Sequence, residues 1–196
     1  KIRTLELLSV LDMLCLVILI VIQTLAAMKM SVLNKLLEQR AYTDAHTGLP
    51  NKDACEVLLN NKETVAEHTA CMMFDLNNLK IINDTKGHSK GDQLILNFAR
   101  LLRNVIPQKD FVGRYGGDEF MVVIYNTSKT EIEDILKQLS REKDRLNSSG
   151  NNMPIDYACG WAISDADSEC TIQMLLDKAD YYMYENKQAY KKSKKS

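Results

Sequence analysis

The distribution of apolar residues divides the chain into an almost uniformly hydrophobic N-terminal stretch and a longer region in which apolar and polar positions alternate. Met13–Met28 contains no charged side chain, and extending it towards the N-terminus adds only Glu6 and Asp12. A helix that crosses the hydrocarbon core of a membrane needs about 20 mostly apolar residues. We therefore predict a transmembrane helix within residues 1–28. A soluble coiled-coil stalk is the alternative, but Leu14–Ile22 lacks the polar positions that a stalk would show.

The segment that follows, residues 29–43, keeps a helical pattern with fewer apolar positions. Val32, Leu33, Leu36 and Leu37 are its apolar side chains. It is either a simple linker or a helix that transmits a signal and pairs with a partner chain.

From residue 44 onwards the pattern alternates between helix and strand periods. Asp44–Lys52 contains Gly48 and Pro50 and therefore predicts a turn. Expected helices cover Asp53–Leu59, Asn77–Thr85, Asp92–Ile106, a segment from Thr130 to Leu146, and the region of Ile172–Met183. Expected strands are Ala70–Leu76, Phe111–Tyr115, Phe120–Tyr125 and Ile155–Ile163. Thr130 and Glu133 have the spacing of a capping box. This order predicts an α/β (α+β) domain with a mixed central sheet flanked by helices.

Composition narrows the partners and the compartment. The formal net charge of -1 leaves no global basic field, so we expect no nucleic-acid partner. The five cysteines show no C-x-x-C spacing, which argues against a zinc site or a disulfide framework and favours a reducing compartment. We therefore expect the C-terminal region in the cytoplasm. The chain begins with Lys1 rather than Met, which suggests a fragment of a longer protein.

Candidate chemistry lies in a hairpin between two predicted strands. Gly116 and Gly117 allow a tight turn, and Asp118 and Glu119 follow directly. Adjacent carboxylates repel each other unless a cation or a ligand lies there, although such a hairpin could also display charge to solvent. Asp75 ends a predicted buried strand, where ligands of α/β sheets gather. Carboxylates without a nearby His or Cys favour Mg²⁺ over zinc, and no Walker P-loop is present.

Four segments of the chain resemble the motifs of one known family. They are Asp44–Lys52 (D-A-H-T-G-L-P-N-K), Asp75–Asp92 (D-L-N-N-L-K-I-I-N-D-T-K-G-H-S-K-G-D), Arg114–Phe120 (R-Y-G-G-D-E-F) and Ala179–Lys192. In this order they resemble the GGDEF family of diguanylate cyclases. The resemblance covers residues 44–192, leaves 193–196 as a basic tail, and implies a palm-like nucleotide-cyclase fold.

The resemblance implies a reaction between two GTP-loaded domains that face each other. The 3′-hydroxyl of each GTP would attack the α-phosphate of the other, which gives cyclic di-GMP and two pyrophosphates. The implied metal is Mg²⁺, with Mn²⁺ possible, and its implied ligands are Asp75, Asp118, Glu119 and the backbone carbonyl of Leu76. Glu119 would alternatively deprotonate the 3′-hydroxyl. Lys80 joins Asp118 and Glu119 in the implied catalytic set.

The resemblance also implies how GTP is bound. Asn83 and Asp92 match the guanine-reading pair, and a carboxylate suits the N1–H and N2–H₂ donors that adenine lacks. An acid near a helix N-terminus, favoured by the helix dipole, is the alternative for Asp92. Lys187 and Lys191 lie four residues apart and would share one helix face towards the phosphates. The remaining implied GTP-binding positions are Leu79, Gly116 and Gly117.

Several positions depart from the family's pattern. His46 stands where the opening turn usually has Leu, and Tyr190 and Lys191 replace the Gly-Arg of the closing motif. Many relatives carry an R-x-x-D product-binding site just before the signature. Here Asp110 remains but Pro107 replaces the Arg. We therefore predict no high-affinity product inhibition through that position.

Three hypotheses follow. The first is an active diguanylate cyclase that works as a homodimer through its catalytic domain and N-terminal helix. It would be anchored in the inner, cytoplasmic membrane with the catalytic domain in the cytoplasm. The second is a catalytically silent GGDEF domain that binds GTP as a sensor. The third is a membrane-tethered interaction domain with an incidental acidic hairpin, which leaves the combined motifs unexplained.

Overall fold

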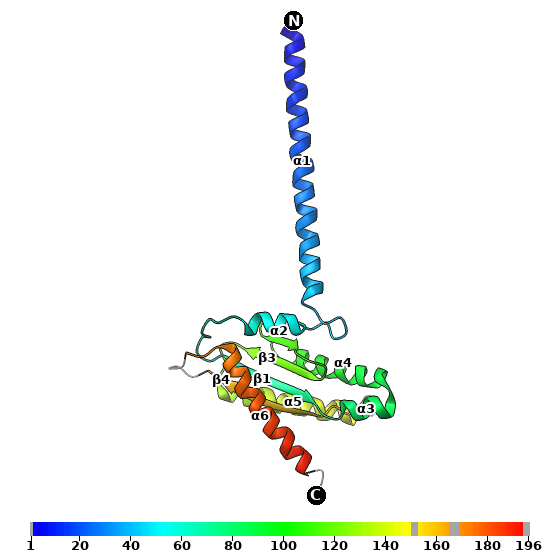
Figure 1. Cartoon of the computed structure of the whole chain (residues 1–196), viewed down its shortest axis with the longest axis vertical. Helices are drawn as coiled ribbons and strands as arrows, with labels where there is room; N and C mark the ends of the chain where they lie inside the picture. Colours follow the sequence, from blue (N-terminus) through cyan, green and yellow to red (C-terminus); the bar gives the residue numbers. More distant parts are fainter. Residues whose placement is uncertain (1, 150–152, 165–168, 194–196) are drawn as a thin grey trace. The chain divides into compact units, whose positions relative to one another are not determined.

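The computed structural model describes residues 2–149, 153–164 and 169–193 of the chain. The chain separates into two compact units, residues 1–41 and residues 42–196. The first unit is a single helix, α1 (Ile2–Ala41), drawn in blue in Figure 1.

Helix α1 is continuous through both the predicted apolar span and the predicted linker. By length and composition, Met13–Glu38 is apolar enough to cross a membrane. The large apolar side chains between Met13 and Leu37 are exposed. The predicted helix is therefore confirmed, whereas its insertion into a membrane stays a prediction.

The second unit is built on a four-stranded sheet in the order β2-β3-β1-β4. The strands are β1 (Ala70–Leu76), β2 (Phe111–Arg114), β3 (Glu119–Ile124) and β4 (Tyr157–Ile163). Each pair of neighbouring strands is antiparallel. The α/β class is confirmed, but the expectation of a mixed sheet was wrong in this respect. A helix that connects two neighbouring strands usually makes those strands parallel. Here the helices after β1 lead to β2, and β2 is not a neighbour of β1 in the sheet.

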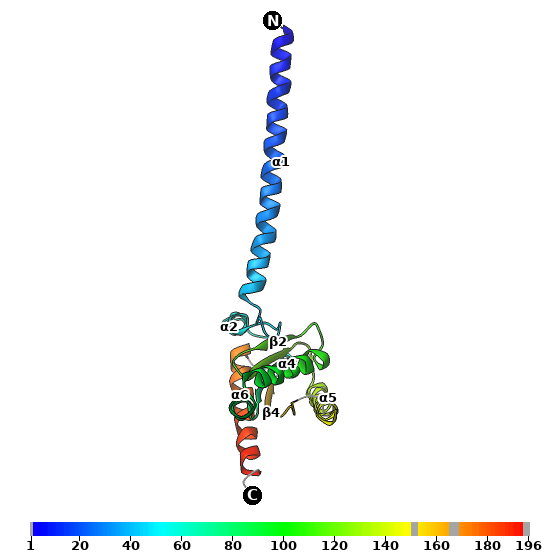
Figure 2. The ribbon, with the colours of Figure 1, turned by 90° about the vertical axis from the view of Figure 1, so that its right-hand side faces the viewer.

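Helices cover both faces of this sheet. Helices α4 (His88–Val105) and α5 (Lys129–Ser148) lie on one face, and α2 (Lys52–Leu59) and α6 (Ile172–Ser193) lie on the other (Figure 2). Successive residues of β1 alternate between the two cores, with Phe74 in the first and Met73 in the second. Every residue of β1 is therefore buried, which explains its continuous apolar run.

Among the helix starts that differ from the sequence expectation, two affect the interpretation. Helix α4 begins at His88 rather than Asp92. Helix α5 has its capping box at Ser128 and Glu131, two residues before the predicted Thr130 and Glu133. Both candidates offer a hydroxyl three residues before an acid, so spacing alone did not distinguish them.

The two faces of strand β4 are buried to different extents. Tyr157, Cys159, Trp161 and Ile163 lie on one face and are half-buried. The fully buried positions are the small residues between them, Ala158, Gly160 and Ala162. Helix α6 packs closely against this strand, so small side chains have the deeper positions.

Candidate active site

The acidic residues meet because of the strand register. In the antiparallel pairing of β1 with β3, Asp75 lies directly opposite Glu119. The backbone N–H of Leu76 donates to the carbonyl oxygen of Asp118 at 3.0 Å, which fixes the preceding turn beside β1. The hairpin therefore adjoins the end of the strand that carries Asp75.

Asp75 is the buried member of this group, with 5% of its surface exposed. One carboxylate oxygen, Oδ2, accepts from Lys187 Nζ at 2.6 Å. The other, Oδ1, is buried and has no hydrogen-bond partner among the described residues. A buried carboxylate oxygen without a donor is costly, so this atom is suited to a ligand.

Glu119 lies in an electrostatic environment that disfavours its ionisation. Burial raises the pKa of Glu119 above the usual 4.5, and the carboxylates of Asp118, Asp75 and Asp180 raise it further. Lys187 acts in the opposite direction. Repulsion among these carboxylates would be relieved by a bound cation.

The first glycine of the signature turn lies close to the Glu119 side chain. The backbone N–H groups of Tyr115 and Gly116 both donate to the carbonyl oxygen of Glu119, at 2.9 and 3.1 Å. A Cβ on Gly116 would lie 2.5 Å from Oε2 of Glu119. A Cβ on Gly117 would meet nothing within 4 Å. Gly116 therefore makes room for the Glu119 carboxylate, and the second glycine leaves open space where a ligand can approach.

A cavity of about 680 Å³ adjoins this turn. Of the predicted site residues, Leu76, Leu79, Lys80, Asp118 and Lys187 line it. Tyr190 and Lys192 also line it and were not predicted. The side chain of Lys191 lies outside the described part of the chain, as do residues 194–196 of the basic tail. An ammonium-rich lining beside carboxylates suits phosphates bound with a divalent cation.

The predicted guanine-reading pair lies at the junction of α3 (Leu79–Lys86) with α4. A Cβ on Gly91 would lie 1.9 Å from Oδ1 of Asn83, so the Asn83 amide lies directly on Gly91, beside Asp92. The Asn83 Oδ1 atom is buried and has no hydrogen-bond partner among the described residues. Leu79 adjoins Gly91 and also lines the cavity, so the two regions are neighbours.

The alternative explanation of Asp92 as a helix-start acid does not agree with the observed helix. Because α4 begins at His88, its first turn contains no acidic residue. The Asp92 residue is exposed, and its backbone carbonyl accepts from His46 Nε2 at 2.9 Å. The departure at His46 therefore connects the opening turn to α4.

The opening turn is also attached to the signature hairpin. Arg114 pairs with Asp44 at 3.1 Å, and its Nη2 donates to the carbonyl oxygen of Gly117 at 2.8 Å. Burial opposes ionisation of Asp44, but hydrogen bonds from Thr47 and the Arg114 charge outweigh it and lower the pKa of this carboxyl below 3.8. Arg114 thus forms an ion pair that connects the opening turn to the signature hairpin.

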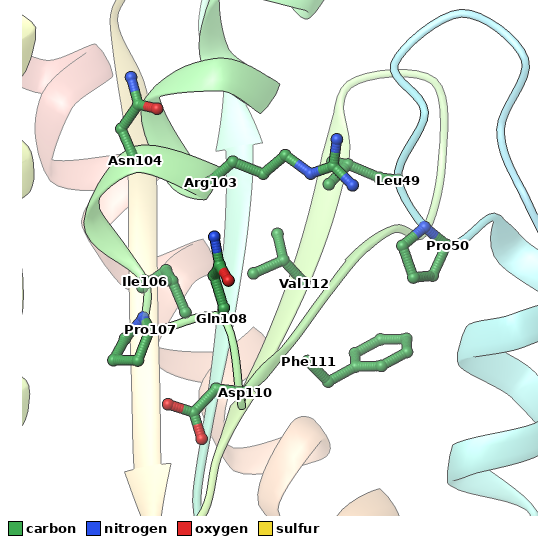
Figure 3. A pocket seen from close by; sticks show the side chains of 10 residues that line it. All are labelled: Leu49, Pro50, Arg103, Asn104, Ile106, Pro107, Gln108, Asp110, Phe111 and Val112. Carbon is green, nitrogen blue, oxygen red and sulfur yellow. The ribbon is translucent and has the colours of Figure 1, made fainter.

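The stretch Pro107–Asp110 lies at a separate cavity of about 580 Å³, shown in Figure 3. Asp110 Oδ1 accepts from the backbone N–H of Tyr125 at 3.1 Å, which gives this carboxylate a structural role. Arg103 also lines the cavity, and its guanidinium donates to the carbonyl oxygen of Gly48 at 3.2 Å. The side chain of Pro107 supplies no donor here.

A divalent metal fits the acidic edge by the chemistry of its donors. The unpartnered Asp75 oxygen, the Asp118 carboxylate and the Leu76 carbonyl are the hard oxygen ligands that Mg²⁺ and Mn²⁺ prefer. Among the residues that the structure describes, however, no three His, Cys, Asp or Glu side chains are gathered closely enough to hold a metal. Lys187 neutralises Asp75 in this arrangement.

The fold and the site together define an α/β domain in which an acidic sheet end adjoins a lysine-lined cavity. Residues 41–193 match the family described as "Diguanylate cyclase, GGDEF domain". The chain belongs to the GGDEF diguanylate cyclase family.

Named relatives agree with this assignment. The chain is 30% identical over 165 residues to the diguanylate cyclase DgcP of Escherichia coli (strain K12), covering 82% of this chain and 48% of that protein. It is 32% identical over 146 residues to the cyclic di-GMP phosphodiesterase PdeB of Shewanella oneidensis, covering 74% of this chain and 17% of that protein. The chain therefore spans less than half of either relative.

Among solved structures, the fold resembles the GGDEF domain of DgcB from Caulobacter crescentus in complex with c-di-GMP. The TM-score is 0.64 at 26% identity, and the match covers 76% of this chain and 91% of that one.

Proposed function

We propose that this chain is a diguanylate cyclase that condenses two GTP molecules into cyclic di-GMP and two pyrophosphates. The observation that carries the proposal is the Asp75 carboxylate. It is paired with Lys187 on one side and unpartnered on the other, beside a cavity lined by Asp118, Lys80 and Lys187. Membership of the GGDEF family supports the same conclusion.

At the phosphate end of the site, carboxylates would bind the metal and lysines would bind the phosphates. Asp75, Asp118 and the Leu76 carbonyl would hold Mg²⁺ or Mn²⁺, which supplies charge neutralisation and acidifies the attacking hydroxyl. Lys187 would exchange Asp75 for a phosphate oxygen, and Lys80 would contact the phosphates from α3. These groups position the α-phosphate for in-line displacement.

The chemical step forms a bond between the 3′-oxygen of one GTP and the α-phosphorus of the other, while the bond to pyrophosphate breaks. Glu119 would accept the proton of the 3′-hydroxyl, which suits a carboxylate whose pKa is raised by its surroundings. The step occurs twice to close the ring.

The guanine end would provide specificity for GTP. The Asp92 carboxylate would accept from N1–H and N2–H₂ of guanine, and the unpartnered Asn83 oxygen would accept a further guanine N–H. Adenine lacks the matching donors, so binding of ATP would leave the Asp92 carboxylate and the Asn83 oxygen without hydrogen-bond donors.

One domain offers one such site, so the reaction needs a second copy of the chain. We propose a homodimer through the catalytic domain and α1, with α1 anchored in the cytoplasmic membrane and the catalytic domain in the cytoplasm. The apolar stretch Met13–Glu38 supports the anchor by length and composition.

The test is to incubate the full chain in detergent with GTP and Mg²⁺ and to detect cyclic di-GMP by mass spectrometry. We expect product from the wild-type chain and at least about 100-fold less from Glu119→Gln. The matched control is Asp134→Asn, an exposed acid on α5 that pairs with the exposed Lys137, and it should retain activity. Absence of product from a folded wild-type chain would contradict the proposal.

The second candidate is a silent GTP-binding domain. This chain is also similar to a protein named as a cyclic di-GMP phosphodiesterase, and the match covers only 17% of that protein. A domain of this kind can therefore be part of a protein that is named for a different activity. GTP binding without any product, measured on the same preparation, would favour this candidate.

A further inference from the structure

The C-terminal end of α6 is attached to the sheet at three successive points. Asn186 Nδ2 donates to the carbonyl oxygen of Cys159 at 2.6 Å. Lys187 Nζ donates to Asp75 Oδ2, also at 2.6 Å. Tyr190 then donates its phenolic hydroxyl to Asp156 Oδ2. The last of these contacts is made by a residue that replaces the glycine of the family's closing motif.

Asp156 connects this helix end to the acidic edge. Its backbone carbonyl accepts from the N–H of Asn77 at 2.9 Å. Asn77 is buried and lies two residues after Asp75. The Tyr190 hydroxyl is therefore linked, through Asp156, to the segment that leaves the end of β1.

Tyr190 is also part of the wall of the 680 Å³ cavity, together with Lys187 and Lys192. The end of α6 thus brings two ammonium groups and one phenol to the place that we propose for the phosphates. Terminal turns of helices fray unless contacts hold them, so the positions of these lysines depend on such contacts.

We propose that Tyr190 is a positioning residue for the triphosphate of GTP. Its hydroxyl bond to Asp156 holds the last turn of α6 at the cavity wall, so that Lys187 and Lys192 face the phosphates. This inference rests on the proposed function, because it takes GTP as the ligand of the cavity. It adds Lys192 to the phosphate-binding lysines.

The need for such an anchor follows from the contact that ligand binding removes. In the proposed reaction Lys187 leaves Asp75 for a phosphate, so one of the three attachments is lost at that moment. The bond from Tyr190 to Asp156 does not involve either reacting group, and it remains. It also keeps the Asp156 carboxylate hydrogen-bonded, so that this anion does not attract one of the lysines away from the phosphates.

The test compares the affinities of the full chain in detergent for GTP and for GMP, by isothermal titration calorimetry with Ca²⁺ as a non-reacting cation. GMP keeps the guanine and the α-phosphate but lacks the outer phosphates. We expect Tyr190→Phe, which removes only the hydroxyl, to weaken GTP about tenfold, the size of one hydrogen bond to a charged group. GMP affinity should change less than twofold. Lys192→Ala should show the same pattern.

Two further variants control the test. Tyr184→Phe removes an exposed hydroxyl on the same helix and should change neither affinity. Asp156→Ala, which removes the acceptor of the Tyr190 hydroxyl, should reproduce Tyr190→Phe, and the double variant should be no weaker than either single variant. Equal losses for GTP and GMP, or no loss for GTP, would overturn the inference. A wild-type chain that binds GTP but makes no cyclic di-GMP would refute the proposed function alone, because the binding comparison does not depend on turnover.

Discussion

At the residue scale, the candidate site depends on individual side-chain oxygen atoms that have no hydrogen-bond partner among the described residues. Asp75 Oδ1 and Asn83 Oδ1 are both buried and unpartnered among the described residues. Each such atom costs roughly 1–3 kcal/mol of stability. The sequence pointed to both residues. Their unpartnered state depends on the surrounding packing, which no local pattern describes.

Gly91 belongs to the guanine end of the site because of its missing side chain. We expect Gly91→Ala to push the Asn83 amide away, since the new Cβ would lie 1.9 Å from the Asn83 Oδ1 atom. The KM for GTP should rise about tenfold, with a smaller change in kcat. Steady-state kinetics of pyrophosphate release would measure both constants.

The control for this substitution is Ser89→Ala, an exposed position on the same helical turn, which should leave KM unchanged. A normal KM for the Gly91→Ala variant would show that the Asn83 amide does not contact GTP. Thermal unfolding should be recorded for both variants, so that a loss of folding is separated from a loss of binding.

Pro107 determines the expected response to product. We expect cyclic di-GMP at low micromolar concentration to leave the initial rate unchanged, because Pro107 stands in place of the arginine of the product-binding motif and its side chain supplies no hydrogen-bond donor. Pro107→Arg should introduce inhibition, since a guanidinium binds phosphate or guanine with two parallel hydrogen bonds.

Gln108→Arg adds the same charge one residue away and should not introduce inhibition. Inhibition of the wild-type chain at low micromolar product would contradict the role that we assign to Pro107.

At the element scale, helix boundaries were the least predictable feature, and one of them changed an interpretation. The apolar period of α4 becomes visible only after Asp92, so the sequence placed the helix start there. In the structure α4 begins at His88, so Asp92 lies beyond the first turn of the helix. The helix dipole, which acts mainly on the first turn, therefore does not explain why an acid stands at this position. The strand register was not predictable from the pattern either, because β1 is buried on both faces and a shift by one residue would leave its burial unchanged.

The capping box of α5 provides a stability test. We expect Ser128→Ala to lower the free energy of unfolding by about 1 kcal/mol, because the hydroxyl accepts from the N–H of Glu131. Thr130→Ala, at the position that the sequence favoured, should cost less than about 0.5 kcal/mol. Urea titration followed by circular dichroism would compare the two variants. A larger loss for Thr130→Ala would show that the helix begins two residues later.

At the scale of the whole molecule, the chain combines an apolar helix with a domain that has its own two cores. We expect the full chain to sediment with membranes, to resist alkaline carbonate and to be released by detergent. Leu19→Arg combined with Ile20→Arg should move it to the soluble fraction, because each central arginine costs about 2.5–3.5 kcal/mol on insertion scales.

Asn34→Arg, near the end of α1, should remain in the membrane fraction, because a charge near the interface costs little. Recovery of the wild-type chain in the soluble fraction would contradict the membrane anchor and leave the stalk as the explanation of α1.

By itself, the sequence determined the α/β class and the family, and it proposed most of the residues of the candidate site. It could do so because helix and strand periods are local, and because motifs such as R-Y-G-G-D-E-F retain their chemistry wherever they fold. Tertiary structure decided which groups meet. The antiparallel register placed Asp75 opposite Glu119, and the packing of α6 brought Lys187, 112 positions away in the sequence, to Asp75. It also attached Tyr190 to Asp156. These pairings depend on the burial of distant elements against one another, and no local pattern in the chain encodes them.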